Sequence, residues 1–144
     1  FRLGEGFTLN LDEILQEAIK NLENSYAPYS KFRVSACAIM ENEKGEIGKF
    51  FGVNIENSSY GLTVCAERVA IFKGVSEGYR KLLKVVLIAS KDGELVEVYP
   101  CGACRQVMWE FGDEGVEIYN GFKKIKLGEL FPRGFRISFK EHGV

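Results

Sequence analysis

Three cysteines in this chain are spaced in a way that could bind a metal ion. Cys101 and Cys104 are separated by two residues in PCGACRQ, and Cys65 lies upstream in TVCAERVA. Alone, a C-x-x-C pair suits a redox couple, half of a structural zinc site, an open disulfide or part of a catalytic metal centre. Because Cys65 and the pair each lie at the start of a predicted helix, the three sulfurs could meet at two helix N-termini, which stabilise thiolates.

Zinc suits three thiolate ligands. Three protein ligands with an open fourth position are typical of a catalytic zinc site rather than a structural one. Neither remaining candidate ligand is expected to join them. Cys37 lies in an apolar strand-like run, where packing is its expected role, and His142 is the only histidine and lies in the final residues. We therefore expect the fourth zinc position to hold water.

Glu67 is the candidate for moving protons at such a water molecule, because it follows Cys65 by two residues in the same predicted helical turn. Three thiolates around Zn²⁺ leave a net negative charge, which weakens the activation of water. The positive ends of two helices and the cation of Arg68 could offset this charge. A role as an ordinary surface arginine is equally open for Arg68.

The first elements that must position these groups can be predicted from apolar spacing. Asn10 and Glu13 resemble a capping box, and apolar residues at helical spacing follow as far as Leu22. The stretch from Tyr26 to Ser30, which contains a proline, ends this helix. The runs FRVSACAIM and FFGVNI then predict two antiparallel strands joined by a turn.

The second half of the chain alternates between helices and strands. A helix is expected over about residues 64–75, and the unbroken run VVLIA suits a strand buried on both faces. Pro100 can open a further helix and Gly112 can close it, while Asn120-Gly121 predicts a hairpin turn. The run GFRISF alternates as a strand would, but it has no predicted place. We expect one mixed sheet with helices packed on its faces.

Size and composition indicate one soluble domain spanning residues 1–144. The chain has 144 residues and a net charge of −1, so no basic excess points to nucleic acid. The sequence shows neither a membrane span nor a secretory signal, which favours the cytoplasm, where thiols are more often metal ligands or catalytic groups. The chain begins with Phe1, and residues 1 to 7 are candidates for disorder or for an origin outside the native chain.

The order of these motifs resembles that of a known family. CAE followed downstream by PCGACRQ resembles the zinc-deaminase signature. Together with YAPYSKFRVSACAIM and GVNIENSSYGLTVCAERVA, it makes about residues 10–135 similar to the small homotetrameric cytidine deaminases. The resemblance implies a three-layer α/β/α sandwich, in which a five-stranded mixed sheet carries helices on both faces. It also implies hydrolysis of cytidine and deoxycytidine to the uridines with release of ammonia, as in pyrimidine salvage.

The resemblance also implies a role for each matching residue. Cys65, Cys101 and Cys104 would hold one zinc ion per subunit, and Glu67 would shuttle protons. Asn54 and Glu56 would bind the hydroxyl of the sugar. The other implied nucleoside contacts are Phe32 and Ala66 and, supplied by neighbouring subunits of a homotetramer, Ser58, Tyr60 and Phe135.

The residues alone leave other roles open, and two positions depart from the family pattern. Asn54 and Glu56 also suit an exposed strand end, and Phe32 and Phe135 also suit ordinary packing. Arg33 stands where the family usually has proline, and LFPRGF replaces the usual LLPGAF.

Other functions compete with this interpretation. One is a deaminase of another aminopyrimidine nucleoside, such as an antibiotic, against which Asn54 and Glu56 argue. Another is a structural zinc module that binds a partner, although three ligands beside a carboxylate favour an enzyme. A thioredoxin-like redox role would leave Cys65 without a task. Editing of polynucleotides would need a basic groove that is not evident in the sequence.

Overall fold

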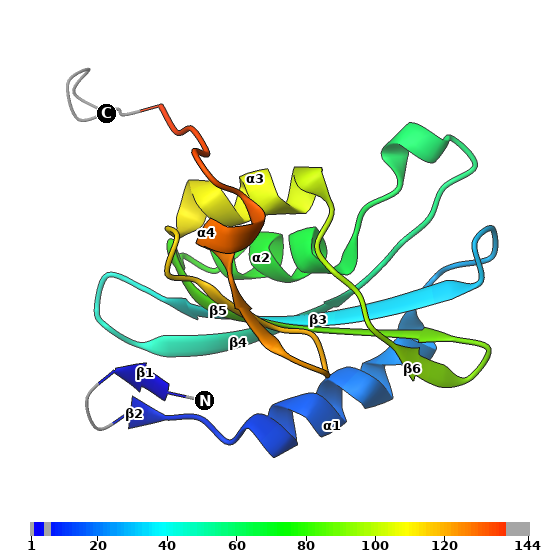
Figure 1. Cartoon of the computed structure of the whole chain (residues 1–144), viewed down its shortest axis with the longest axis horizontal. Coiled ribbons are helices and arrows are strands. Elements are labelled where there is room, and N and C mark those ends of the chain that lie inside the picture. The colour runs from blue at the N-terminus through cyan, green and yellow to red at the C-terminus, as the bar shows by residue number, and fades with distance from the viewer. Residues whose placement is uncertain (1, 5–6, 138–144) are drawn as a thin grey trace.

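The computed structural model describes residues 2–4 and 7–137, and its centre is a six-stranded mixed sheet (Figure 1). Five strands lie side by side in the order β4-β3-β5-β7-β8, and β6 pairs with β5 outside this path. Of these strand pairs, only β5 and β7 run parallel. The strands are β3 (Phe32–Glu41), β4 (Ile47–Val53), β5 (Lys81–Lys91), β6 (Glu94–Val96), β7 (Glu117–Tyr119) and β8 (Lys124–Lys126).

Helices cover both faces of the sheet, which confirms the expected three layers. Figure 1 shows α1 (Leu11–Asn21) on one face and α2 (Ala66–Ser76) with α3 (Gly102–Phe111) on the other. The short α4 (Leu127–Leu130) follows β8 and lies beside α3. Within the described part of the chain, no helix is long and apolar enough to cross a membrane.

Helix α1 begins as its sequence predicts. Asn10 is the N-cap, and its side-chain oxygen accepts the backbone N–H of Glu13 at 3.3 Å. Ile14 and Ala18 then face the sheet, where they pack in one core cluster with Cys37 of β3. Cys37 is fully buried, which confirms the packing role expected for it.

Helix α2 packs unusually close to the opposite face of the sheet. A Cβ atom added at Gly52 of β4 would lie 2.6 Å from the backbone nitrogen of Ala70 and 2.9 Å from the carbonyl oxygen of Ala66. A Cβ atom at Gly74 would lie 2.4 Å from the sulfur of Met40. These two glycines therefore let the helix backbone approach the strands.

Several boundaries differ from those predicted. Strand β4 begins at Ile47 and ends at Val53, so Asn54 lies just after it. Pro100 does not open α3, because the first helical hydrogen bond, from Arg105 N–H, closes on the carbonyl of Cys101, which is the N-cap. The sheet also has one strand more than expected, because the short segment β6 pairs with the end of β5.

The chain ends also differ from expectation. Arg2–Gly4 and Phe7–Thr8 form a separate two-stranded ribbon (β1 and β2) that the sequence did not indicate. Residues 134–137 of GFRISF form no strand. The rest of that run and His142 lie outside the described residues, and the expectations for them stay predictions.

Candidate active site

The three cysteines of the predicted metal site do meet at two helix N-termini. Cys65 is the N-cap of α2, Cys101 is the N-cap of α3, and Cys104 lies in the first turn of α3. Their sulfur atoms all lie within 4.8 Å of one another, and those of Cys65 and Cys101 are 3.7 Å apart. Within the described residues, no further histidine, cysteine or carboxylate belongs to this group. The arrangement fits three protein ligands with an open fourth position.

The electrostatics of the sulfurs also suit a cation. A hydrogen bond from the Cys104 thiol lowers the pKa of Cys65 to about 5, against the opposing effect of burial. The same contact, together with burial, raises the pKa of Cys104. The pKa shifts of Cys65 and Cys104 are therefore opposite, because adjacent thiolates repel one another. A soft divalent cation such as Zn²⁺ supplies the charge that three thiolates need, so this donor set fits zinc.

Glu67 is held next to these sulfurs in the first turn of α2. Only 4% of its surface is exposed. Burial raises the pKa of its carboxyl to about 7, and the neighbouring Cys65 thiolate adds to this shift. A carboxyl with a pKa near neutral pH can both accept and donate a proton, as a general acid and base must.

Arg68 contacts the sulfur cluster directly, which favours the charge-offsetting role over that of an ordinary surface arginine. Its Nη2 donates to the sulfur of Cys65 at 3.5 Å. Its Nε is buried and has no hydrogen-bond partner among the described residues. A guanidinium in this place lowers the local negative charge.

A cavity of about 260 Å³ opens beside Glu67 and brings together most of the predicted site. Its lining includes residues from β3, from the segment after β4, and from the starts of α2 and α3. Of the predicted residues, the cavity wall contains Phe32, Asn54, Glu56, Cys65, Ala66, Glu67 and Cys101. Lining residues that the sequence did not single out are Ser30, Val34, Thr63, Val98 and Tyr99.

Asn54 is tied into the protein as well as facing the cavity. Its side-chain oxygen accepts the N–H of Val34 at 2.9 Å and a hydrogen bond from Ser25 Oγ. Its Nδ2 donates to the carbonyl of Phe32 at 2.8 Å. Because an amide nitrogen carries two hydrogens, this bond leaves one for a ligand. Asn54 is thus more than the exposed strand end that the sequence left open.

Glu56 is fixed by the turn that precedes β3. Its Oε1 accepts the backbone N–H groups of Tyr29 at 3.0 Å and Ser30 at 3.1 Å, and its Oε2 accepts Ser30 Oγ. Although desolvation opposes the change, these bonds lower the pKa of the Glu56 carboxyl. Sequence reasoning missed both residues of this turn, whose only local sign is the PYS sequence before the strand.

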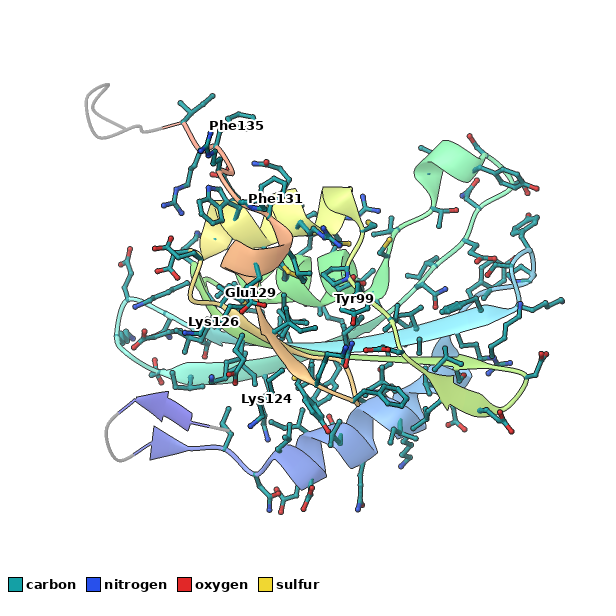
Figure 2. The ribbon with its side chains drawn as sticks, in the orientation of Figure 1. Tyr99, Lys124, Lys126, Glu129, Phe131 and Phe135 are labelled. Atoms are coloured by element: carbon teal, nitrogen blue, oxygen red, sulfur yellow. The ribbon has the colours of Figure 1, made fainter. Side chains whose placement is uncertain are left out.

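Three of the predicted nucleoside contacts, Ser58, Tyr60 and Phe135, do not line this cavity. Ser58 Oγ is 2.6 Å from Tyr29 Oη, and the ring of Tyr60 makes an edge contact with Tyr29 at 5.9 Å between centroids. Phe135 lies beside the C-terminal half of α3, whereas the cavity-lining Tyr99 precedes that helix (Figure 2). Tyr60 is 76% exposed and Phe135 is 70% exposed.

Arg33, which departs from the family pattern, does not point into the cavity. Its Nη1 donates to the carbonyl of Leu22 at 3.3 Å, in the short 3-10 helix Leu22–Asn24 that continues α1. It therefore ties the start of β3 to the helix on the other face of the sheet.

Comparisons with known proteins agree with this geometry. A family model described as "Cytidine and deoxycytidylate deaminase zinc-binding region" matches residues 9–120. The cytidine deaminase of Halalkalibacterium halodurans is 42% identical over 127 residues, covering 85% of this chain and 91% of the relative. The cytidine deaminase of Sporosarcina psychrophila is 42% identical over 132 residues, covering 88% of this chain and 92% of the relative. The crystal structure of cytidine deaminase from Mycobacterium tuberculosis is 32% identical and superposes with a TM-score of 0.74, covering 90% of this chain and all of the other.

Proposed function

The chain belongs to the cytidine and deoxycytidylate deaminase family, and from this we propose that it is a zinc-dependent hydrolase that converts cytidine to uridine and releases ammonia. We extend the proposal to deoxycytidine and deoxyuridine, and so to pyrimidine salvage. The observation that carries it is the meeting of three cysteine sulfurs beside the buried Glu67, with Glu67 and two of the cysteines in the wall of one cavity.

Cys65, Cys101 and Cys104 would hold the zinc ion. When bound, zinc supplies the Lewis acidity that makes water nucleophilic near neutral pH. The chain contributes Arg68 and the N-termini of α2 and α3, whose positive charge offsets that of the thiolates.

Glu67 would carry the protons of the reaction. Its carboxylate accepts a proton from the attacking water and delivers it to N3 of the pyrimidine while oxygen bonds to C4. It then transfers the second proton of that water to the amino group, so that the C4–N bond breaks and ammonia leaves. The raised pKa of Glu67 supports this double role, because neither proton transfer is then strongly uphill.

Recognition of the sugar would rest on Glu56, Asn54 and Phe32. Glu56 and Asn54 would accept from and donate to a sugar hydroxyl, and the ring of Phe32 would lie against the nucleoside. A base without its sugar would leave these polar groups unpaired, so free cytosine should be a poor substrate. Their shared place in the cavity wall supports this assignment.

Replacing Glu67 with glutamine tests the function. Glu67→Gln keeps the size of the side chain but removes its capacity to accept a proton, so we expect turnover of cytidine to fall by at least about 10²-fold. Zinc content should stay near one per chain, and the fold should be unchanged. The ultraviolet change of cytidine, the release of ammonia and the bound metal give the three readouts.

The matched control is Glu77→Gln, an exposed glutamate at the other end of the same helix, which should keep wild-type activity. Full activity in Glu67→Gln would contradict the mechanism. Zinc-loaded wild-type protein that deaminates neither cytidine nor deoxycytidine would contradict the substrate and favour a structural zinc module.

We also propose that the enzyme is a homotetramer whose cavities are completed by Ser58, Tyr60 and Phe135 of neighbouring subunits. The small cavity supports this, since ligand pockets usually hold about 300–1,000 Å³. The exposure of the two aromatic rings supports it as well. A cytoplasmic location is consistent with the free thiols of all four cysteines.

A further inference from the structure

The turn before β3 is built to present hydrogen-bond donors to Glu56. Lys31 adopts a left-handed backbone conformation with φ of 59°, and its N–H donates to the carbonyl of Ala27 at 3.0 Å. This fold of the chain turns the N–H groups of Tyr29 and Ser30 toward the Glu56 carboxylate, which lies 26 residues beyond Ser30 in sequence.

Ser30 makes more of these contacts than any other residue. Its N–H donates to one carboxylate oxygen of Glu56 at 3.1 Å, and its hydroxyl donates to the other. The same hydroxyl oxygen accepts the N–H of Phe32 at 3.0 Å. A single side chain thus connects Glu56 with Phe32, and all three residues line the cavity.

The turn is itself anchored from the sheet. Lys91, the last residue of β5, donates from Nζ to the carbonyl of Ser30 at 3.1 Å. In the sheet, Lys91 is the register partner of Phe32. The backbone of Ser30 is therefore held on one side by Lys91 and on the other by the carboxylate that it binds.

We propose that Ser30 is the positioning residue for sugar recognition, because it fixes the Glu56 carboxylate in the orientation that accepts a sugar hydroxyl. A carboxylate has about four acceptor sites, and the donors of Tyr29 and Ser30 occupy three of them. One site is left for a ligand in the cavity. The inference rests on the proposed contact between Glu56 and the sugar.

The test compares two substrates in each variant: cytidine, and 2′,3′-dideoxycytidine, which lacks both ring hydroxyls. Ser30→Ala should lower kcat/KM for cytidine by about tenfold, mainly through KM, since one charge-assisted hydrogen bond is lost. The value for dideoxycytidine should change by less than about twofold, because that substrate has no ring hydroxyl for Glu56 to bind. The ratio of the two values does not depend on how much of a variant is folded.

Two further variants sharpen the comparison. Ser30→Thr keeps the hydroxyl and should restore the wild-type ratio, and Ser90→Ala, which removes a hydroxyl from β5, should not change it. An equal loss for both substrates in Ser30→Ala would show a merely structural role and overturn the inference.

Glu56→Gln separates this inference from the proposed function. If Glu56→Gln removes the preference for cytidine over dideoxycytidine but Ser30→Ala does not, the positioning role is wrong and the sugar contact stands. If Glu56→Gln leaves the preference intact, the sugar contact itself is wrong, and the role of Ser30 falls with it.

Discussion

Identical side chains have different chemistry in this protein because their surroundings differ. Cys37 lies in the middle of β3, where burial raises its pKa to about 12. Cys65 is only partly buried and has its pKa lowered to about 5. The thiolate is the form that reacts with thiol reagents. Once no metal protects the site, Cys65 should therefore react much faster with such reagents than Cys37.

Removal of the metal should therefore expose a specific pair of thiols. In zinc-loaded protein all four cysteines should react slowly with iodoacetamide. After chelation, Cys65 and the exposed Cys101 should be labelled first, whereas Cys37 and Cys104, both fully buried, should react only on unfolding. Mass spectrometry of labelled peptides measures each site. Labelling of Cys37 together with Cys65 would contradict the burial on which this prediction depends.

The proposed contribution of Glu56 to recognition of the sugar should persist at mildly acidic pH. The pKa of the Glu56 carboxyl in the folded protein lies below its ordinary value of 4.5. The carboxylate is therefore charged at any pH above 4.5, and it loses its charge only as the pH falls through its lowered pKa. We expect the ratio of kcat/KM for cytidine and dideoxycytidine to stay constant between about pH 8 and about pH 5. A fall in the ratio that is centred near pH 6 would show that another group controls recognition.

The sequence predicted residues whose roles depend on local pattern and missed those whose roles depend on distant contacts. Cys65 and Glu67 could be predicted because both lie in one helical turn, and a C-x-x-C pair places two ligands at the start of another helix. Ser30 could not be predicted, because its contact with Glu56 spans 26 residues and forms only when the turn before β3 folds.

At the scale of elements, the position of the metal ligands depends on how closely α2 packs on β4. A Cβ atom on Gly52 would lie 2.6 Å from the backbone nitrogen of Ala70 and 2.9 Å from the carbonyl oxygen of Ala66, the residue between Cys65 and Glu67. Both nearest atoms are backbone atoms of the helix, so a rotamer change cannot relieve the clash. The helix must instead move away from the sheet and carry Cys65 and Glu67 with it.

Gly52→Ala should consequently reduce both stability and activity. We expect a loss of about 1–3 kcal/mol in the free energy of unfolding, as for other overpacked cores. Turnover of cytidine by the folded fraction should also fall, because Cys65 and Glu67 move relative to Cys101 and Cys104 on α3. Chemical denaturation and steady-state kinetics measure the two effects. In the matched control, Gly61→Ala, a Cβ atom meets nothing within 4 Å, so unfolding should be unchanged.

The long elements and the β7–β8 hairpin around Asn120-Gly121 could be predicted from sequence, whereas β6 and α4 could not. Helix α1 carries a capping residue and several turns of apolar spacing, and β3 is a ten-residue run. By contrast, β6 has three residues and α4 has four, so neither offers a full period of pattern. Their formation depends on contacts with β5 and α3 that the local sequence does not encode.

At the scale of the whole molecule, Phe135 and Arg136 are held against α3 in a way that leaves the ring of Phe135 exposed. Arg136 donates from Nη1 to the carbonyl oxygens of Trp109 and Gly112 at 3.1 and 2.9 Å. Gln106 donates to the carbonyl of Phe135 at 3.2 Å. The backbone at Phe135 is thus held in place while its ring is exposed, as a group that enters another subunit's cavity would need to be.

Mixing two defective variants can show whether a cavity is shared between subunits. Glu67→Gln chains lack the proposed proton carrier but keep Phe135, and Phe135→Ala chains keep Glu67. If Phe135 of one chain completes the cavity of another, refolding the variants together at equal amounts should restore both groups in about a quarter of the sites, by random assortment. Activity of the mixture should then exceed the mean of the two variants refolded separately. Activity equal to that mean, in oligomers shown by mass spectrometry to contain both chains, would mean that each cavity is complete within one chain or that Phe135 has no part in it.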